Sequence, residues 1–261
     1  MIRTIILLVS LAVSNAASAE APLSLADVID LVRPAVVGVG TAYPPRQPLG
    51  GKPANQLRGT GFAIGDGLLI ATNDHVLPET VDTENRQSLA VFVGRGSGAT
   101  VRVATVAARD PDHDLALLKI EGYPLPTLAL GETDQVREGD LVAFTGFPIG
   151  AVLGLYPVTH SGIVSSITPM VRAADSVKNL TATQLQRMRD PYEVFQLDAV
   201  AYPGNSGSPV YRAFTGELIG VINSVFVKES REALLERPSG ISYAVPVRHL
   251  RVLLKRVDSG S

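Results

Sequence analysis

The sequence predicts an all-β fold, a sandwich or barrels, and three observations lead to this expectation. Short β-favouring runs recur along the chain, and Gly, Pro, Asn and Asp residues separate them. A Pro-Ile-Gly stretch at residues 148–150 is the natural seam between two groups of runs. The hydrophobic content of 46% and the charged content of 18% are typical of a chain that folds. We therefore expect two β units, one over residues 24–150 and one over residues 151–257.

The expected strands follow one another at short intervals. In chain order they cover residues 35–40, 68–72, 89–93, 100–107, 115–120, 141–145, 162–167, 195–197, 208–211, 218–225 and 241–244. Two helices flank them: residues 24–32 form a short helix capped by Ser24, and residues 247–257 have helical spacing directly after Pro246.

Three connections are long, and loops of such length are usually functional or disordered. Residues 43–58 are rich in Pro and Gly and predict a mobile loop. Residues 167–193 contain a helical-looking piece at 181–189, and residues 227–239 are charged, with a short helical turn within them. Either regulatory loops or simple surface insertions fit this pattern.

Composition excludes several classes of protein. The formal net charge of −2 leaves no basic surface for nucleic acid. The chain has no Cys, so disulfides, thiolate metal sites and a lipidated cysteine are ruled out. We expect neither a cofactor nor a metal ion.

The first 19 residues have the pattern of an export signal. Arg3 supplies a positive charge, residues 5–13 form an apolar core, and Ala17-Ser18-Ala19 is a small-x-small cleavage pattern. The apolar run is shorter than the roughly 20 residues that span a bilayer, although an uncleaved anchor stays open. We expect cleavage after Ala19 and a mature chain in the periplasm or outside the cell.

The candidate nucleophile is Ser206, which lies in the turn Tyr-Pro-Gly-Asn-Ser-Gly-Ser-Pro at residues 202–209. Apolar runs flank this turn on both sides. Gly204 and Gly207 permit a positive φ or a close approach of the backbone. Such a turn can expose a serine hydroxyl and direct backbone N–H groups toward one point, as an oxyanion hole requires. An ordinary hairpin loop has similar residues.

His75 and Asp114 complete a candidate triad with Ser206. A serine hydroxyl needs an imidazole to take its proton and a carboxylate to orient that imidazole. His75 ends an apolar run within Thr-Asn-Asp-His-Val, and Asp114 opens the run at residues 115–118. The chain order His, Asp, Ser is that of chymotrypsin-type enzymes and differs from those of subtilisin and the α/β-hydrolases.

Other residues of the same types compete for these roles, but their surroundings differ. They are His113, His160, His249, Asp110, Asp112 and Ser208. The three histidines lack the Thr-Asn-x-His-Val context, the two aspartates lie in a Pro-containing turn, and the serine lies outside the Gly-Asn-Ser-Gly frame.

These motifs together resemble the HtrA/DegP-like serine proteases, in the same order along the chain. The resemblance covers about residues 24–250 and is carried by residues 59–64, 72–76, 114–119, 161–165, 198–199, 203–207 and 240–246. It implies two antiparallel six-stranded β-barrels of the chymotrypsin or trypsin type with a short C-terminal helix. The active site would lie in the cleft between the barrels.

The resemblance also implies a role for each site residue. His75 would act as general base and then as general acid, Asp114 would orient it, and Ser206 would form an acyl-enzyme. The backbone N–H groups of Gly204, Asn205 and Ser206 would bind the oxyanion.

A substrate pocket follows from the same resemblance. Val200 would form its base, and its wall would include Ile222, Asn223 and Ser224. An apolar base would favour small or medium aliphatic side chains over Lys or Arg.

Two residues depart from the patterns of related enzymes. Ser208 stands where HtrA-like relatives usually have a second glycine, which would cost on the order of 1 kcal/mol if the position needs a positive φ. Asn205 stands where trypsin-type zymogens carry an aspartate that pairs with a newly cut N-terminus. We therefore expect no activation by that ion pair.

The expected function is that of an exported serine endopeptidase that cleaves unfolded or damaged polypeptides. Only 14 residues follow Val247, so we expect no PDZ domain and no PDZ-mediated partner. Trimers are common in the family, and the sequence leaves a homo-oligomer open. The alternative is a catalytically weak barrel that binds peptides by strand addition, as a chaperone or adaptor. The triad order disfavours an esterase.

Overall fold

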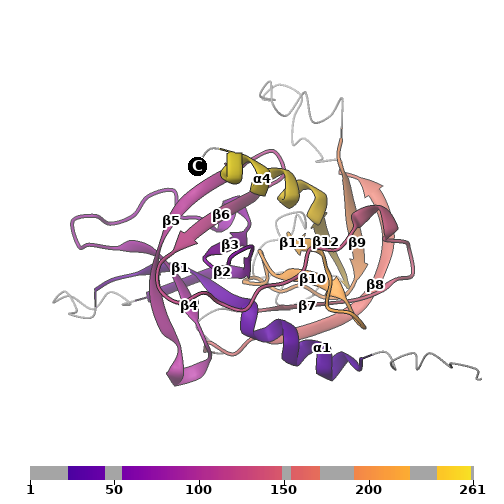
Figure 1. Ribbon diagram of the computed structural model, residues 1–261, viewed down its shortest axis with the longest axis horizontal. Helices are drawn as coiled ribbons and strands as arrows, with labels where there is room; N and C mark the ends of the chain where they lie inside the picture. Colours follow the sequence, from indigo (N-terminus) through magenta and orange to yellow (C-terminus); the bar gives the residue numbers. More distant parts are fainter. Residues whose placement is uncertain (1–22, 45–54, 149–153, 171–190, 224–239, 260–261) are drawn as a thin grey trace, which may run out of the picture.

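The computed structural model describes residues 23–44, 55–148, 154–170, 191–223 and 240–259. These residues form two closed, six-stranded antiparallel barrels that lie side by side (Figure 1). A short helix lies near the start of the described chain and another at its end. The predicted all-β fold is therefore confirmed.

The first barrel has the strand order β1-β2-β3-β6-β5-β4, and β4 closes it by pairing with β1. Its strands are β1 (Val36–Ala42), β2 (Asn55–Ile64), β3 (Leu69–Thr72), β4 (Ser88–Val93), β5 (Thr100–Asp110) and β6 (Leu115–Ile120). Inward-pointing aliphatic side chains such as Val39, Ile70 and Leu118 fill its centre, as the alternation of side chains along a strand requires.

The second barrel repeats this topology with the order β7-β8-β9-β12-β11-β10. Its strands are β7 (Leu141–Gly146), β8 (Val158–Pro169), β9 (Glu193–Asp198), β10 (Pro209–Arg212), β11 (Leu218–Ile222) and β12 (Ile241–Pro246). Its centre includes Phe144, Phe195 and Leu197. Four short 3-10 turns complete the described elements: η1 (Arg33–Ala35), η2 (Asp74–Val76), η3 (Gly96–Gly98) and η4 (Thr133–Gln135).

Helix α1 (Leu25–Val32) begins where the sequence predicts it. The Ser24 hydroxyl accepts a hydrogen bond from Asp27 N–H at 3.2 Å, and Asp27 Oδ2 accepts one from Ser24 N–H at 3.1 Å. This reciprocal capping box satisfies two N–H groups that have no partner inside the helix.

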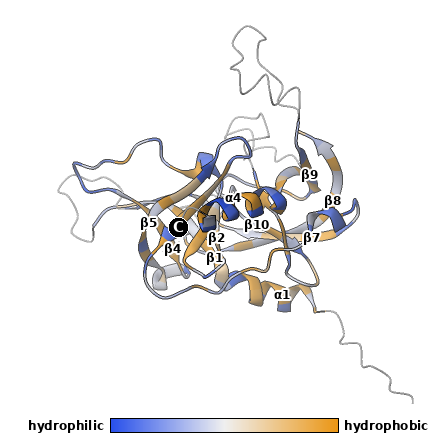
Figure 2. Ribbon diagram, turned by 45° about the horizontal axis from the view of Figure 1, so that its top comes forward, coloured by the Kyte–Doolittle hydropathy of each residue, from blue (hydrophilic) through white to orange (hydrophobic). Residues whose placement is uncertain are grey.

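Helix α4 (Val247–Ser259) starts directly after β12 and joins the two barrels. It contacts β11 and β12 of the second barrel and also β5 and β6 of the first. Val247, Leu250 and Leu253 are fully buried and belong to an apolar cluster that includes residues of both barrels. Hydrophilic residues alternate with these along the helix (Figure 2), so its apolar stripe faces the protein.

The structure corrects two expectations from the sequence: the boundary between the barrels and the extent of the loop at residues 43–58. The seam expected at residues 148–150 lies too late, because β7 pairs with β8 and β10 and belongs to the second barrel. The connection between the barrels therefore runs between Ile120 and Leu141. The loop expected over residues 43–58 ends earlier than predicted, because its last four residues open β2.

Strand β2 was not among the expected strands, and its composition explains why. Its first residues are polar and mostly exposed, whereas its buried half contains Gly59 and Gly61. A Cβ atom at Gly61 would lie 2.8 Å from side-chain carbons of both Ile70 and Val39. Close packing therefore selects glycine where a β-branched residue would have signalled a strand.

Three sequence expectations lie outside the described residues: the export signal at 1–19, the helical piece at 181–189 and the charged segment at 227–239. Among the helices that the structure describes, none combines the length and the hydrophobicity needed to cross a bilayer.

Candidate active site

His75 lies in η2, directly after β3 ends in the first barrel. The backbone of Asp114 holds this turn in place. Its carbonyl oxygen accepts hydrogen bonds from Asn73 Nδ2 at 2.9 Å and from Asp74 N–H at 3.2 Å. Asn73 is fully buried, so these hydrogen bonds hold the segment before His75 against the segment of Asp114.

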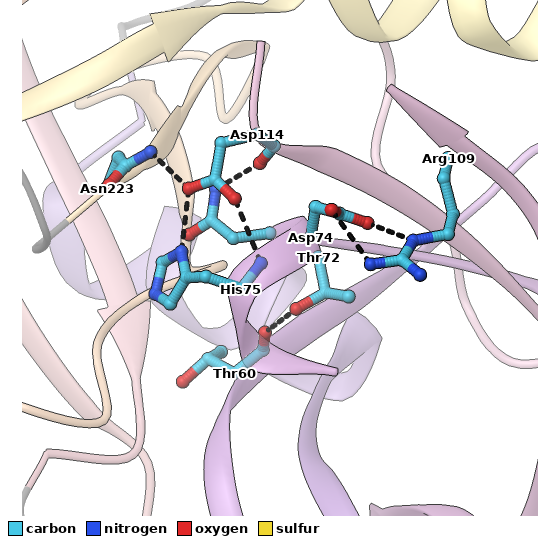
Figure 3. Close-up of polar contacts among 8 residues, drawn as sticks. Thr60, Thr72, Asp74, His75, Arg109, Asp114 and Asn223 are labelled. Carbon is cyan, nitrogen blue, oxygen red and sulfur yellow. Dashed lines mark hydrogen bonds and ion pairs between the residues drawn. The ribbon is translucent and has the colours of Figure 1, made fainter. Parts of the chain in front are cut away.

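The carboxylate of Asp114 grips His75 at two atoms (Figure 3). Asp114 Oδ2 lies 2.6 Å from His75 Nδ1, and Asp114 Oδ1 accepts a hydrogen bond from the His75 backbone N–H at 2.9 Å. This arrangement places the Nδ1 proton toward the carboxylate and leaves Nε2 to accept a proton. The sequence-predicted pair is thus brought together.

Asp114 has a backbone conformation that is unusual for its residue type. Its φ of +53° lies in the left-handed region, and only Arg86 shares this among the described non-glycine residues. Aspartate tolerates this region better than most residues, but it still carries strain. Here the strain accompanies a carboxylate held by the hydrogen bonds to His75.

Asn223 contacts the same carboxylate from the second barrel. Its Nδ2 donates to Asp114 Oδ2 at 2.6 Å (Figure 3), and its side chain is fully buried. The side-chain amide of Asn223 is therefore engaged on Asp114, and the place of Asn223 in the pocket wall stays a prediction. The sequence could not predict the contact with Asp114, because the two residues are more than 100 residues apart along the chain.

An ion pair lies beside the candidate triad. Both oxygens of the Asp74 carboxylate accept hydrogen bonds from Arg109, and the bond from Nη2 is 2.9 Å long (Figure 3). Hydrogen bonding to this carboxylate raises the pKa of the Arg109 guanidinium. The bidentate pair ties the His75 turn to β5 and was not anticipated from the sequence.

The turn that carries Ser206 has the glycine conformations that its sequence predicts. Gly204 has φ +100° and Gly207 has φ +85°. A Cβ atom on Gly207 would lie 2.0 Å from the carbonyl oxygen of Thr60, so no larger residue fits there. Both glycines are therefore needed for backbone geometry and not only for a loop.

Ser206 lies next to the His75 turn, across the junction of the barrels. A Cβ atom on Gly59 would meet the Ser206 carbonyl oxygen at 2.9 Å and Val76 Cγ2 at 2.7 Å. The nucleophile candidate and the residue after His75 thus border the same point on β2. Ser206 itself is 4% exposed.

One of the three expected oxyanion donors is otherwise engaged. The backbone N–H of Asn205 donates to the carbonyl oxygen of Tyr202 at 2.9 Å. This N–H therefore points into its own turn, and its assignment to the oxyanion hole is wrong. The N–H groups of Gly204 and Ser206 stay as predicted donors.

The question raised by Ser208 has a mixed answer. Its φ is not positive, so serine carries no left-handed strain at this position. Its hydroxyl, however, is buried and finds no hydrogen-bond partner among the described residues, and the same holds for both amide atoms of Asn205. A Cβ atom on Gly146 would lie 1.9 Å from Ser208 Oγ and 3.0 Å from Asn205 Oδ1, so these polar groups adjoin one glycine.

The residues expected to form the substrate pocket differ in their burial. The side chain of Ile222 is fully buried in the core of the second barrel, and its assignment to the pocket wall stays a prediction. Val200 is half-buried and stays the predicted base. Ser224 lies outside the described residues.

Two competing histidines form a separate cluster beside Asp114. His113 Nδ1 lies 2.9 Å from Asp110 Oδ2, and its ring stacks on His249 of α4 at 3.9 Å between centroids. The Tyr192 ring meets both imidazoles edge-on. Burial, with the nearby charges of His113 and Arg248, lowers the pKa of His249 to about 3.

Asp110 and His160, two other candidates for the site roles, contact neighbouring side chains outside the candidate triad. Burial raises the pKa of the Asp110 carboxyl, but hydrogen bonds and charge from His113 outweigh it, so the net pKa is lowered. His160 stacks on Phe144 at 5.0 Å, and burial lowers its pKa. Within the described ranges, no group of three or more His, Cys, Asp or Glu side chains is arranged to hold a metal ion.

Residues 59–221 match the trypsin-like peptidase domain, which is more than half of the chain. The chain belongs to the trypsin-like peptidase family. This peptidase domain is 36% identical over 233 residues to "Serine protease HTRA2, mitochondrial" of Bos taurus, covering 89% of the chain and 43% of that protein. It is 33% identical over 190 residues to "Probable periplasmic serine endoprotease DegP-like" of Halomonas elongata, covering 72% and 32%.

The fold of this trypsin-like peptidase domain also matches a solved structure. "HtrA-type protease AlgWS227A with decapeptide" superposes with a TM-score of 0.62 at 24% identity, over 92% of the chain and 68% of that protein's chain. The chain spans less than half the length of the curated relatives named above. The predicted likeness to HtrA/DegP proteases is confirmed.

Proposed function

We propose that this domain is a serine endopeptidase in which Ser206 is the nucleophile, His75 the general base and Asp114 its orienting carboxylate. The observation that carries the proposal is the two-point contact between Asp114 and His75. It fixes the imidazole and its tautomer, as nucleophilic catalysis by serine requires. The nearby turn of Ser206, in which only glycines have a positive φ, supports the same assignment.

The reaction follows from these positions. His75 Nε2 takes the proton of Ser206 Oγ while the oxygen attacks the scissile carbonyl carbon. Two backbone N–H groups, those of Gly204 and Ser206, stabilise the tetrahedral oxyanion. The imidazolium then gives its proton to the departing amine, and an acyl-enzyme forms. A water molecule, deprotonated by His75, releases the acyl group by the same steps in reverse order.

The substrates in this proposal are unfolded or damaged polypeptides, reached after export. Similarity to proteins described as periplasmic serine endoproteases supports export, as does the signal pattern of residues 1–19. The half-buried Val200 favours small or medium aliphatic side chains at the cleaved position. Assembly into a homo-oligomer stays a prediction.

Labelling and cleavage test the proposal directly. The mature chain is incubated with unfolded casein and, separately, with a fluorophosphonate probe, beside a Ser206→Ala variant. We expect cleavage and labelling that the variant loses by at least about 1,000-fold, because its nucleophile is gone. Ser208→Ala is the matched control and should still be labelled.

The opposite result has a clear meaning. A folded wild-type chain that neither cleaves casein nor reacts with the probe contradicts the enzyme proposal. If such a chain still binds unfolded casein, the alternative of a peptide-binding chaperone or adaptor is favoured.

A further inference from the structure

Thr60 of the first barrel makes two hydrogen bonds to the Ser206 turn of the second barrel. Its backbone N–H donates to the Ser206 carbonyl oxygen at 2.8 Å, and its hydroxyl donates to the Gly204 carbonyl oxygen at 2.8 Å. Thr60 is fully buried in β2. One residue therefore contacts both peptide groups that flank the Asn205–Ser206 peptide.

The hydroxyl of Thr60 is itself fixed in orientation. It accepts a hydrogen bond from Phe147 N–H, just beyond β7, at 3.0 Å, so its proton is directed to Gly204. Its carbonyl oxygen accepts a hydrogen bond from the Thr72 hydroxyl of β3 at 2.7 Å (Figure 3). Each of these bonds is buried, where a hydrogen bond resists exchange with water.

The same two peptide groups are also held at their N–H ends. The Asn205 N–H donates to Tyr202 at 2.9 Å, and the Gly207 N–H donates to Ile222 at 3.0 Å. Because a peptide group is planar, a bond at each end fixes the whole plane. The intervening peptide, which carries the Ser206 N–H, thus lies between two fixed planes.

The Ser206 turn packs tightly against Thr60, with no room for a side chain at Gly207. A Cβ atom on Gly207 would lie 2.0 Å from the Thr60 carbonyl oxygen and 2.6 Å from the Thr72 hydroxyl. The turn is therefore seated directly on β2. A shift of Thr60 would have to move the turn as well.

We infer that Thr60 is a positioning residue that sets the oxyanion turn from the opposite barrel. It acts through Gly204 and Ser206 and does not touch the substrate. The inference builds on the proposed function, since it assigns a part in that reaction to a residue outside the triad. It also ties formation of the oxyanion site to docking of the two barrels.

The test compares Thr60→Val with Thr60→Ser in steady-state peptide hydrolysis. Valine keeps the size and β-branching of threonine but cannot bond Gly204 or Phe147. We expect kcat to fall on the order of 10- to 100-fold with KM changed less than about threefold, because the lost alignment acts in the transition state. Serine keeps the hydroxyl and should restore kcat to within about threefold of wild type.

Thr41→Val is the matched control. Thr41 is a buried β1 threonine of the same barrel whose hydroxyl accepts a hydrogen bond from Gln87 at 2.9 Å. A similar loss of kcat in this control would attribute the effect to general destabilisation and overturn the inference. If Thr60→Val does not fold, Thr60→Cys replaces it, since a thiol is a weaker donor of similar size, and its kcat should fall in the same direction.

Amide hydrogen exchange separates this inference from the proposed function. In the Ser206→Ala background, Thr60→Val should accelerate exchange of the Asn205 and Gly207 N–H groups at least about tenfold relative to the rest of β10 and β11. If exchange is accelerated in this background while the folded wild-type chain shows no peptidase activity, the proposed function alone is contradicted and the role of Thr60 in holding the turn stands. Unchanged exchange, or unchanged kcat in an active enzyme, overturns the role of Thr60.

Discussion

Two buried polar side chains of this domain, Asp114 and Ser208, differ sharply in the hydrogen bonds that they make. Asp114 uses both carboxylate oxygens on His75 and a third contact on Asn223, while its backbone adopts a left-handed φ. Ser208, by contrast, buries a hydroxyl that bonds nothing among the described residues. Both carboxylate oxygens of Asp114 are thus hydrogen-bonded, whereas the Ser208 hydroxyl loses its contacts with water on folding and gains no hydrogen bond from the described residues in exchange.

Ser208→Ala should therefore leave stability unchanged or raise it. Removing a buried hydroxyl without a partner removes its desolvation cost, of about 1 to 3 kcal/mol, while the small cavity left behind offsets part of this gain. We expect the free energy of unfolding to rise by about 1 kcal/mol in urea titrations. A loss of more than about 1 kcal/mol would show that the hydroxyl has a partner that these contacts do not reveal.

At the scale of elements, α4 packs on strands of both barrels, and we expect its His249 to make this junction sensitive to acid. The pKa of His249 is lowered to about 3, below the roughly 6.5 of an unfolded histidine. The folded chain therefore excludes a proton that the unfolded chain binds. This contribution to stability is complete above pH 6.5 and is lost as the pH falls from 6.5 toward 3.

His249→Phe tests this linkage. Phenylalanine keeps the stacking on His113 and the edge contact with Tyr192 but cannot bind a proton. Between pH 7 and 5, wild type should lose stability faster than the variant, by less than about 1.4 kcal/mol per pH unit. Unfolding by urea at several pH values measures the difference. Identical slopes would contradict the assignment, since Asp110 and His160 are common to both proteins.

Most elements were predictable because their physical signals are local. The capping box of α1 and the helical spacing of α4 are read within one or two turns. Strand β2 escaped because its signal depends on tight packing of Gly61 against residues of other strands. The boundary between the barrels was predicted too late for a similar reason. The barrel to which β7 belongs is decided by the strands that it pairs with, and no local sequence pattern shows this pairing.

At the scale of the whole molecule, the candidate site is shared between two barrels of the same topology. His75 and Asp114 come from the first barrel, and Ser206 and Asn223 come from the second. The candidate triad was assigned from motif context, and the contact between His75 and Asp114 agrees with that assignment. The roles of Asn223, Thr60 and Arg109 were not, because each arises from a contact between distant segments.

Asn223→Ala should weaken the link between the barrels at the triad. The variant loses the amide that donates to Asp114 Oδ2, so the carboxylate holds His75 with one fewer constraint. We expect kcat to fall about tenfold with the protein still folded, a cost of about 1.4 kcal/mol in transition-state stabilisation. Steady-state kinetics with circular dichroism as the folding check measure it, and an unchanged kcat would remove Asn223 from the positioning network.

The position of α4 in chain order has a consequence for biosynthesis. The helix follows the last strand of the second barrel, yet it packs on strands of the first. Every residue of the candidate site is thus synthesised before α4, which contacts both barrels. The cross-barrel contacts of α4 would therefore form only after both halves of the candidate site have been synthesised, so the fully packed site would be among the last parts of this domain to form.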